Sequence, residues 1–278
     1  MAGFSDSHFD DLKQIVRAAA DTEIMPRFRT LGREDVETKK SAIDVVTEAD
    51  TLAEIQITKA LQALYPGALV FGEEAHARDT CLTSGLDEVE LAFIIDPVDG
   101  TLNFVKGLPL FGTLLSVIRY GEPIGGMIYD PVNRAFLMAS RGGGARQVSA
   151  TGHETRLRVA APAPLKDMSG SMCLMFFPEP HKTRIANQLG RIGPFHGVNC
   201  SVYDYWLVAT GGAHFCFNLC GQIWDHLAGT LIHSEAGGFN AHFDGSPYNA
   251  LGEPANVLAA PDQESWELIR REVVGLSA

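Results

Sequence analysis

The sequence predicts a layered fold in which helices pack on sheets, of the α+β or α/β class. Two segments with helical periodicity come first, a run of strand-like segments separated by turns follows, and strand-like and helical segments then alternate. This order of elements is typical of domains whose sheets are covered by helices. The chain has 278 residues, which is long enough to bury a substantial core without disulfides or structural metals.

Both N-terminal helices are predicted from the spacing of apolar residues. Apolar side chains three or four positions apart predict an amphipathic helix over residues 8–25. A second apolar stripe runs from Leu52 to Leu64, and it follows Thr47 and Asp50, which have the T-x-x-D spacing of a helix start. The two helices therefore come before the first strand that the sequence predicts.

A series of strands is predicted after the second helix. Their apolar segments lie at residues 68–74, 89–96, 113–120, 122–130 and 134–140. Short turn sequences rich in Gly, Pro, Asp and Asn separate the later strands, and the Gly-rich run at 141–144 predicts another turn. This spacing is typical of an antiparallel meander.

A joint between two domains is predicted over residues 150–168, which contain two prolines and little periodicity. We therefore expect an N-terminal domain over 1–155 and a C-terminal domain over 156–278, which together form one catalytic unit. Strands are predicted in the second domain at residues 170–177, 196–200 and 213–219, and helices at 181–191, 203–210, 225–236 and 262–274.

Composition argues against several classes of protein. The chain has 22 Lys+Arg and 34 Asp+Glu, so its formal net charge is −12; this disfavours a nucleic-acid-binding module, which needs a basic surface. No stretch approaches the ~18 apolar residues of a membrane span, and the acidic N-terminus is unlike a signal peptide. Five cysteines do not suggest a disulfide framework. We expect a cytoplasmic protein without nucleic-acid or membrane partners.

The segment IIDPVDGTLNF, residues 94–104, carries the strongest signal for chemistry. Asp96 and Asp99 follow a buried apolar strand, and the proline between them stiffens the corner. Two carboxylates at such a corner can converge on one point. Gly100 and Thr101 then begin a predicted short helix whose free N–H groups suit a phosphate. The alternative is an ordinary D-x-x-D turn.

The segment VFGEE, residues 70–74, also ends a strand with acids. Because side chains alternate along a strand, Glu73 and Glu74 are expected to point in opposite directions. One of them can then face a site while the other meets solvent. The alternative interpretation is a solvated acidic turn.

The segment QIWDHLAG, residues 222–229, places Asp225 at the start of a predicted helix. The alternative role for this residue is the N-cap, which aspartate often occupies. His226 and His233 share a face of the same helix, and without a second close ligand we interpret them as packed histidines. Asp50 has a similar alternative, as a first-turn carboxylate that is stabilised by the helix dipole.

In chain order, Glu73, Asp96, Asp99 and Asp225 make a set of hard oxygen ligands. Such ligands suit Mg²⁺, which keeps several waters and shares oxygens of a substrate phosphate. A site with two such ions stabilises both the attacking and the leaving oxygen of an in-line displacement. The acids together therefore predict Mg²⁺-dependent phosphate chemistry.

Three motifs in this order, GEE, DPVDGTLNF and WDHLAG, with KK-x3-DVVTEAD upstream, resemble those of the inositol monophosphatase family. The resemblance runs from about Lys39 to Gly238. It implies a layered αβαβα fold like that of inositol monophosphatase and fructose-1,6-bisphosphatase, a homodimer, and a lithium-sensitive phosphatase that uses two to three Mg²⁺ ions.

The resemblance also implies a set of metal ligands. Glu73, Asp96 and the backbone carbonyl of Val98 correspond to ligands of a first ion. Asp96, Asp99 and Asp225 correspond to ligands of a second ion, and Glu73 also approaches a third.

Other positions correspond to residues that act on water and substrate. Thr101, backed by Asp50, orients the attacking water, and the N–H groups of Gly100 and Thr101 hold the phosphate, to which Asp99 and Asp225 lie close. Lys39 matches a lysine near the site. Taken without the resemblance, Lys39 and its neighbour Lys40 indicate only a solvated loop.

The chain departs from the family where the leaving group would bind. Members that cleave inositol phosphates typically have a glutamate seven residues before the aspartate of the WD motif, and here Asn218 takes that place. We therefore expect a small polar metabolite phosphate as substrate, with inositol phosphate, another sugar or polyol phosphate, histidinol phosphate or a nucleotide 3′-phosphate as candidates. A regulatory protein that keeps the fold without catalysis is the alternative from another class.

Overall fold

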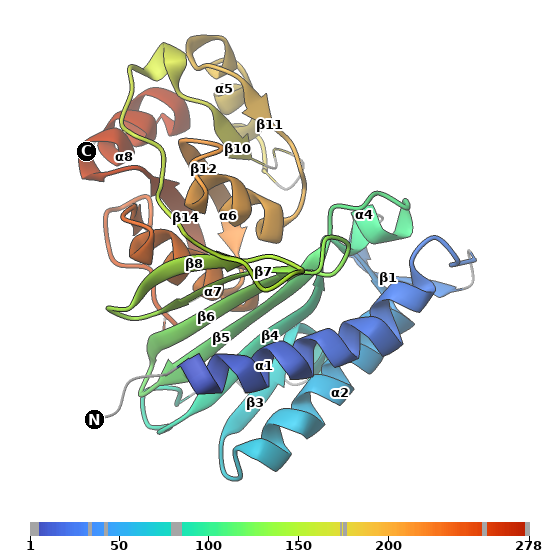
Figure 1. Ribbon diagram of the computed structural model, residues 1–278. Helices are drawn as coiled ribbons and strands as arrows, with labels where there is room; N and C mark the ends of the chain where they lie inside the picture. The colour runs from blue at the N-terminus through green and yellow to red at the C-terminus, as the bar shows by residue number, and fades with distance from the viewer. Residues whose placement is uncertain are drawn as a thin grey trace.

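Two sheets organise the chain, and helices cover their outer faces and fill the space between them (Figure 1). This computed structural model describes residues 6–32, 35–41, 44–78, 85–172, 174, 177–251 and 255–275. Among these residues, no helix combines the length and the apolar character that a membrane span requires.

The larger sheet has seven strands in the order β3-β4-β5-β6-β7-β8-β9. Its members are β3 (Leu69–Gly72), β4 (Ala92–Asp99), β5 (Gly112–Arg119), β6 (Glu122–Asp130), β7 (Ala135–Ser140), β8 (Gly144–Val148) and β9 (Glu154–Arg156). β3 runs parallel to β4, and every later pair is antiparallel. The predicted meander is therefore confirmed, although Gly144, predicted as part of a turn, begins β8.

Helices α1 (Asp6–Ala19) and α2 (Glu48–Leu64) cover one face of this sheet. A π-helical turn, Ala20–Ile24, continues α1, so the helix predicted over 8–25 is confirmed in extent. The apolar stripes of both helices pack on alternate residues of the central strands and make one core cluster. The T-x-x-D start predicted for the second helix is confirmed: Thr47 is the N-cap, and it forms a capping box with Asp50.

The smaller sheet has five strands in the order β11-β10-β12-β14-β13. They are β10 (Gly170–Met172), β11 (Phe195–His196), β12 (Phe215–Gly221), β13 (Phe239–Ala241) and β14 (Ala255–Ala260). The strand predicted over 196–200 is therefore shorter and begins one residue earlier. Residues 173, 175 and 176 of the strand predicted over 170–177 lie outside the described residues.

Helices α6 (Ser201–Ala209) and α7 (Ile223–Glu235) lie between the two sheets. α7 comes from the second half of the chain, yet it packs on β5, β6 and β7 of the larger sheet. Helices α5 (His181–Ala186) and α8 (Gln263–Ile269) cover the outer face of the smaller sheet. The layers are therefore helix, sheet, helix, sheet, helix, which is the predicted αβαβα arrangement (Figure 1).

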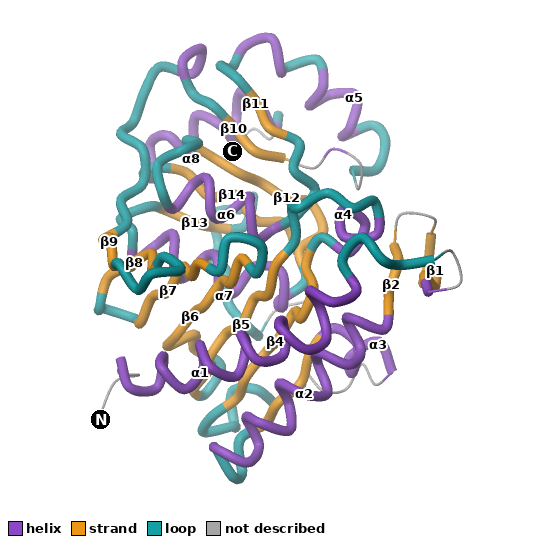
Figure 2. The backbone as a smooth tube through the Cα atoms, turned by 45° about the vertical axis from the view of Figure 1, so that its right-hand side comes forward, coloured by secondary structure: helices purple, strands orange, loops and turns teal. Residues whose placement is uncertain are grey.

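A separate hairpin precedes α2. Its strands, β1 (Val36–Ser41) and β2 (Asp44–Thr47), pair antiparallel and stand beside the short helix α4 (Thr101–Val105), away from both sheets (Figure 2). The solvated loop that we considered for Lys39 is therefore wrong, because this residue lies within β1.

A candidate metal centre

Asp96 and Asp99 are brought to the same side of β4 by an irregularity in the strand. In a regular strand, residues three apart point to opposite faces. The register between β4 and β5 shifts between Asp96 and Asp99, and such bulges redirect side chains. The Val98 N–H also donates to Asp96 Oδ1 at 3.1 Å. The D-x-x-D segment is therefore a bulged strand end, and the turn that we considered as an alternative is wrong.

Asp225 joins these two acids from α7. Each of the three side chains has a carboxylate oxygen within 4.8 Å of the others. α7 begins at Ile223 after the N-cap Gln222, so Asp225 lies inside the first turn of the helix. The N-cap role that we considered for Asp225 is therefore wrong. The three acids meet because the N-terminal end of α7 lies at the end of β4.

The three carboxylates lie in an environment that disfavours their charge. Burial and the neighbouring acids raise the pKa of Asp96 and of Asp225 well above the ordinary value for aspartate. Burial also raises the pKa of Asp99, although several N–H donors oppose the effect. Buried carboxylates aimed at one another are stable when a cation compensates them. The donor set therefore fits a hard divalent cation.

Asp99 is also tied to the first turn of α6. Its Oδ2 accepts hydrogen bonds from Val202 N at 2.6 Å and from Cys200 Sγ at 2.9 Å. Neither Cys200 nor Val202 was predicted as a site residue, because neither residue type signals a contact about a hundred positions away in the chain. These bonds fix the carboxylate of Asp99 between the two sheets.

Glu73 and Glu74 do not end a strand as predicted. β3 stops at Gly72, and the short helix α3 (Glu73–Arg78) begins at once. Both carboxylates consequently point to the same side chain, the ammonium of Lys39. Its Nζ lies 2.8 Å from Glu73 Oε1 and 2.6 Å from Glu74 Oε1. The expected opposite directions are therefore wrong. The solvated turn is wrong as well, because Glu74 is only 6% exposed.

Glu73 interacts electrostatically with the three clustered aspartates. Its charge raises the pKa of Asp96 and of Asp225. Burial by itself would lower the pKa of Lys39, but Glu73 and Glu74 together raise it above its ordinary value. The Lys39 ammonium thus compensates acids at the edge of the cluster.

Glu54 of α2, which was not predicted as a site residue, binds the start of α3. Its two carboxylate oxygens accept hydrogen bonds from Glu74 N at 2.9 Å and Ala75 N at 2.8 Å. These are N–H groups of a first helical turn, which have no partner within the helix. Glu54 therefore stabilises the helix start that positions Glu73.

Asp50 uses its two oxygens for different purposes. Oδ2 accepts hydrogen bonds from the N–H and the hydroxyl of Thr47, at 2.9 and 2.6 Å, and completes the capping box of α2. Oδ1 accepts from Thr101 Oγ1 at 3.0 Å. Burial raises the pKa of Asp50 to about 7. The helix-start interpretation is thus confirmed for Asp50, and a contact to Thr101 exists beside it.

Thr101 begins α4 directly after Gly100. Gly100 has a φ of 84°, and a Cβ there would lie 2.8 Å from the carbonyl oxygen of Leu110, so glycine is required. The Thr101 hydroxyl lies 2.9 Å from the carbonyl oxygen of Val98 as well as near Asp50. The Gly100 N–H donates to the carboxylate of Asp99.

Asn218 lies on β12, and its side chain is near the buried Asp204 of α6: burial raises the pKa of Asp204 to about 7, and the side chains of Ser171 and Asn218 oppose the rise. The charge of Asp99 acts on this carboxylate as well, so the pair lies close to the aspartate cluster. His226 and His233 are buried on α7, and burial lowers their pKa values to about 3 and about 4. The interpretation of these histidines as packed residues agrees with this burial.

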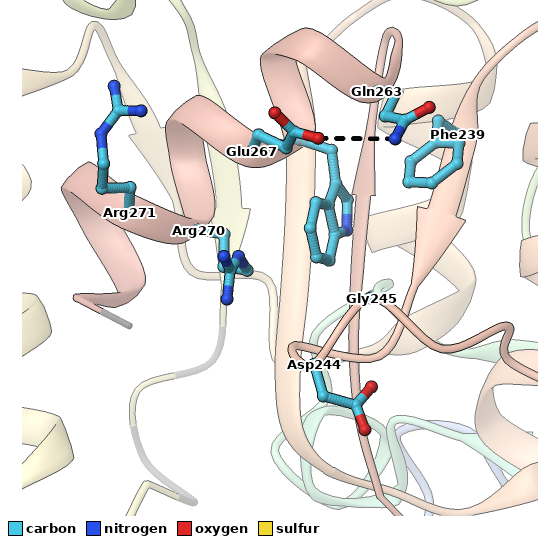
Figure 3. Close-up of a pocket in the computed structure, with 8 residues that line it drawn as sticks. Phe239, Asp244, Gly245, Gln263, Glu267, Arg270 and Arg271 are labelled. Carbon is cyan, nitrogen blue, oxygen red and sulfur yellow. Dashed lines mark hydrogen bonds between the residues drawn. The ribbon is translucent and has the colours of Figure 1, made fainter. Parts of the chain in front are cut away.

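A surface pocket of about 360 Å³ lies elsewhere, over α8 and β13 (Figure 3). Its lining includes none of the predicted site residues. Within it, the Arg270 guanidinium lies over the ring of Trp266 at 5.5 Å and donates to the carbonyl oxygen of Phe243 at 3.2 Å. These are packing contacts of the C-terminal helix.

Comparison with known proteins gives consistent results. Residues 7–277 match the sequence model of the Inositol monophosphatase family. The chain is 32% identical over 237 residues to a protein named Nus factor SuhB from Pasteurella multocida (strain Pm70), which covers 82% of this chain and 83% of that protein.

Solved structures share the fold. An IMPase from Thermotoga maritima superposes with a TM-score of 0.78 and 26% identity, covering 96% of this chain and 95% of that one. The extragenic suppressor protein suhB from Bartonella henselae superposes with a TM-score of 0.81 and 24% identity, covering 96% and 98%. The layered arrangement described above is therefore one that these proteins also adopt.

Proposed function

The chain belongs to the inositol monophosphatase family, and we propose that it is a Mg²⁺-dependent phosphomonoesterase acting on a small phosphorylated metabolite. The observation that carries the proposal is the convergence of Asp96, Asp99 and Asp225 within 4.8 Å at the end of a buried strand. Three acids from two distant parts of the chain, with raised pKa values, have no structural need to meet there.

The metal ligands in this proposal are the clustered aspartates, together with Glu73 and the carbonyl oxygen of Val98. When bound, two to three Mg²⁺ ions supply positive charge to the phosphate oxygens and make a water more acidic. Without cations the acids repel a phosphate dianion, because their charges have the same sign. Lys39 contacts both Glu73 and Glu74 and offsets part of their negative charge at the edge of the site.

The attacking water is oriented by Thr101 and Asp50 in this proposal. The Thr101 hydroxyl can donate its proton to Asp50 Oδ1, 3.0 Å away, and its oxygen can then accept a hydrogen bond from water. Asp50, with its pKa raised to about 7, is suited to take up a proton near neutral pH. The capping box holds its other oxygen and so fixes the side chain.

Phosphate binding is assigned to the start of α4. The N–H of Thr101 supports this assignment, as do the positions of Asp99 and Asp225, which would hold cations against the phosphate. The N–H of Gly100, predicted as a second donor, also lies close enough to Asp99 to lower the pKa of its carboxyl.

The leaving group is assigned to the region of Asn218. A neutral amide there, where inositol-cleaving members carry glutamate, supports a substrate other than inositol phosphate alone. Histidinol phosphate and nucleotide 3′-phosphates stay candidates beside inositol phosphate. A cytoplasmic homodimer without membrane or nucleic-acid partners belongs to the same proposal; the net charge of −12 supports its nucleic-acid part, because binding to nucleic acid needs a basic surface.

The second candidate is a regulatory protein that keeps the fold. The observation in its favour is that relatives from Pasteurella multocida and Haemophilus influenzae carry the name Nus factor SuhB. A purely regulatory protein does not need the aspartate cluster, so catalysis separates the two candidates.

The test is phosphate release from a panel of phosphate monoesters, with Mg²⁺ and with excess chelator. We expect turnover with Mg²⁺ only, since uncatalysed monoester hydrolysis is extremely slow. Asp225→Asn should lower kcat/KM by at least about 100-fold, whereas Asp10→Asn, which changes an exposed acid on α1, should leave it unchanged. Full turnover in chelator contradicts the metal mechanism, and absence of turnover on every ester favours the regulatory candidate.

A further inference from the structure

Asn103 is a buried residue of the DPVDGTLNF motif to which the proposed function gives no role. It lies on α4 and is 4% exposed. Its side-chain nitrogen, Nδ2, lies 2.9 Å from the carbonyl oxygen of Leu110 and 2.8 Å from that of Val198, and the carbonyl oxygen of Asn199 is 3.4 Å away. Carbonyl oxygens only accept hydrogen bonds, so the end of the amide that faces them is the one with the two N–H donors.

The two shorter contacts of Asn103 have different consequences. Leu110 lies in the loop between α4 and β5, so the bond to its carbonyl oxygen closes a local loop. Val198 lies 95 positions away in the chain, just before α6. The bond to Val198 therefore joins the segment 99–103 to the segment 198–202, which comes from the other half of the chain.

These two segments also contact each other at their other ends. There, Asp99 Oδ2 accepts hydrogen bonds from Val202 N at 2.6 Å and from Cys200 Sγ at 2.9 Å. Between the ends the segments approach closely, because a Cβ at Gly100 would lie 3.1 Å from Cys200 Sγ. Asp99 is thus the acceptor that joins the segments at one end, and Asn103 is the donor that joins them at the other.

The backbone of Asn199 shows that the second segment needs such contacts. Its φ of 51° lies in the left-handed region, which residues other than glycine rarely adopt and which surrounding contacts must maintain. The carbonyl oxygens of Val198 and Asn199 both face Asn103 Nδ2. Loss of this donor would remove a partner from both carbonyls and allow the segment to relax. The groups that donate to Asp99 follow directly in the chain and would move with it.

We propose that Asn103 is a positioning residue for Asp99: it fixes the segment 198–202, and this segment fixes the orientation of the Asp99 carboxylate. The inference rests on the proposed function, because it takes Asp99 as a ligand of Mg²⁺. Asn103 acts through the backbone, since its Nδ2 is committed to carbonyl oxygens. Its removal therefore weakens Mg²⁺ binding and leaves the chemical step at saturating Mg²⁺ largely intact.

Asn103→Asp tests this role, because it keeps the shape of the side chain and replaces the donating nitrogen by an acceptor. With p-nitrophenyl phosphate as substrate, we expect the Mg²⁺ concentration for half-maximal activity to rise at least about tenfold. At saturating Mg²⁺, kcat should stay within about threefold of that of the unmodified protein. An unchanged Mg²⁺ requirement in folded Asn103→Asp overturns the inference.

Asn240→Asp is the matched control. Asn240 lies on β13, and its Nδ2 also donates to a backbone carbonyl oxygen, that of Thr230, at 3.0 Å. The same chemical change is therefore made at a part-buried amide that does not contact the segment 198–202. Its Mg²⁺ requirement should stay within about twofold of that of the unmodified protein, and a rise equal to that of Asn103→Asp overturns the inference.

A milder variant keeps the inference testable if Asn103→Asp does not fold. Asn103→Ser retains one donor on a shorter side chain, and its Mg²⁺ requirement should rise at least about threefold. A purely structural role for Asn103 predicts a lower melting temperature and an unchanged Mg²⁺ requirement. That result in Asn103→Ser overturns the inference.

Cys200→Ala shows whether Asn103 acts through the segment 198–202. This variant removes the thiol that donates to Asp99, so it should also raise the Mg²⁺ requirement. If Asn103 holds the segment in place, Asn103→Ser has already displaced this thiol. The double variant should then be affected by less than the product of the two single effects, whereas independent effects multiply. A full product means that Asn103 acts by another route and overturns the inference.

Melting temperatures separate this inference from the proposed function. The rise in melting temperature with Mg²⁺ reports ion binding without turnover. It should be smaller in Asn103→Asp than in the unmodified protein and in Asn240→Asp; an equal rise in all three, or no rise in any, overturns the inference. If the unmodified protein hydrolyses no ester, the proposed function fails, and the melting temperatures still decide whether Asn103 positions a metal ligand.

Discussion

Asp50 illustrates how one side chain can serve both the fold and the candidate site. A capping aspartate needs only one oxygen, and here Oδ2 completes the cap of α2 while Oδ1 accepts from the Thr101 hydroxyl. The cap removes the rotational freedom of the carboxylate, so Oδ1 stays aimed at Thr101. A structural role for an acid in a first helical turn therefore does not exclude a chemical one.

Removal of the Thr101 hydroxyl tests this pair. Thr101→Ala should lower kcat by about 100-fold or more, because positioned proton transfer contributes about 10²–10⁴. The Mg²⁺ concentration for half-maximal activity should change much less, since the hydroxyl is not assigned as a ligand. Initial rates over a Mg²⁺ titration measure both quantities. Thr101→Ser, which keeps the hydroxyl, should retain most of kcat. If Thr101→Ala instead changes only the Mg²⁺ requirement and leaves kcat unchanged, Thr101 acts in metal binding.

Residues of the candidate site divide into those that a motif reveals and those that only the fold reveals. Asp96, Asp99 and Asp225 stand in short motifs with unusual acids after apolar segments, and the structure brings them together. Glu54 and Asp204 stand within ordinary helical sequence. Glu54 accepts from the first turn of α3 and Asp204 accepts from Ser171 on β10, and local sequence patterns do not encode contacts between such separate elements.

Among the secondary-structure elements, α3 shows why a local prediction fails. The VFGEE segment alternates like a strand end, but Glu54 of α2 accepts the N–H groups of Glu74 and Ala75 and stabilises a helix instead. Gly72 makes this possible, because a Cβ there would collide with the Glu54 carboxylate and lie 2.8 Å from the carbonyl oxygen of Ile95. A contact between distant elements overrides the local strand pattern.

Gly72→Ala should therefore disturb the start of α3 and, through it, Glu73. The added methyl displaces Glu54, and loss of a residue that orients a ligand typically weakens metal affinity about 10–100-fold. We expect the Mg²⁺ concentration for half-maximal activity to rise at least about tenfold, measured well below the melting temperature. Gly190→Ala is the matched control, because a Cβ there meets nothing within 4 Å. An unchanged Mg²⁺ requirement in Gly72→Ala would show that the start of α3 does not position a metal ligand.

Three of the strands that were not predicted share a physical cause. β8, β9 and the hairpin strand β1 are short and rich in polar residues, with the sequences GARQV, ETR and VETKKS. Such strands have no apolar alternation, and they form because a neighbouring strand offers its hydrogen-bonding edge.

β14 was missed for another reason. Its sequence, ANVLAA, is short and almost continuously apolar, and such a run shows neither strand nor helix periodicity. The strands of the larger sheet from β4 to β7 and the helices α1, α2 and α7 were predicted, since burial of one face imposes a periodicity that the sequence displays.

At the scale of the whole molecule, the candidate metal centre lies where the two halves of the chain meet. β4 of the larger sheet supplies two aspartates, and α7 and α6, inserted between the sheets, supply the third and the donors that hold Asp99. The division of the chain at residues 155 and 156 stays a prediction. Whatever the boundary, neither half alone holds all three acids.

This arrangement makes the stability of the protein depend on pH and Mg²⁺ together. The folded-state pKa values of Asp96, Asp99 and Asp225 lie above ordinary aspartate values. The metal-free folded state therefore binds more protons than the unfolded chain, and these groups lose stabilising free energy as pH rises through their folded-state pKa values. Mg²⁺ binds the deprotonated cluster and offsets this loss at high pH.

We therefore expect Mg²⁺ to raise the melting temperature, and to raise it more at pH 8 than at pH 5.5, where protons compete for the same oxygens. Thermal unfolding at both pH values, with Mg²⁺ and with chelator, measures the two increments. Asp225→Asn removes one charge from the cluster, so its metal-free form should lose less stability between pH 5.5 and pH 8 than the unmodified protein does. The rise in its melting temperature with Mg²⁺ at pH 8 should also be smaller. If protons and Mg²⁺ compete for the same carboxylates, the rise in melting temperature with Mg²⁺ must depend on pH. An equal rise at both pH values would therefore mean that the three acids do not bind the ion in their deprotonated form.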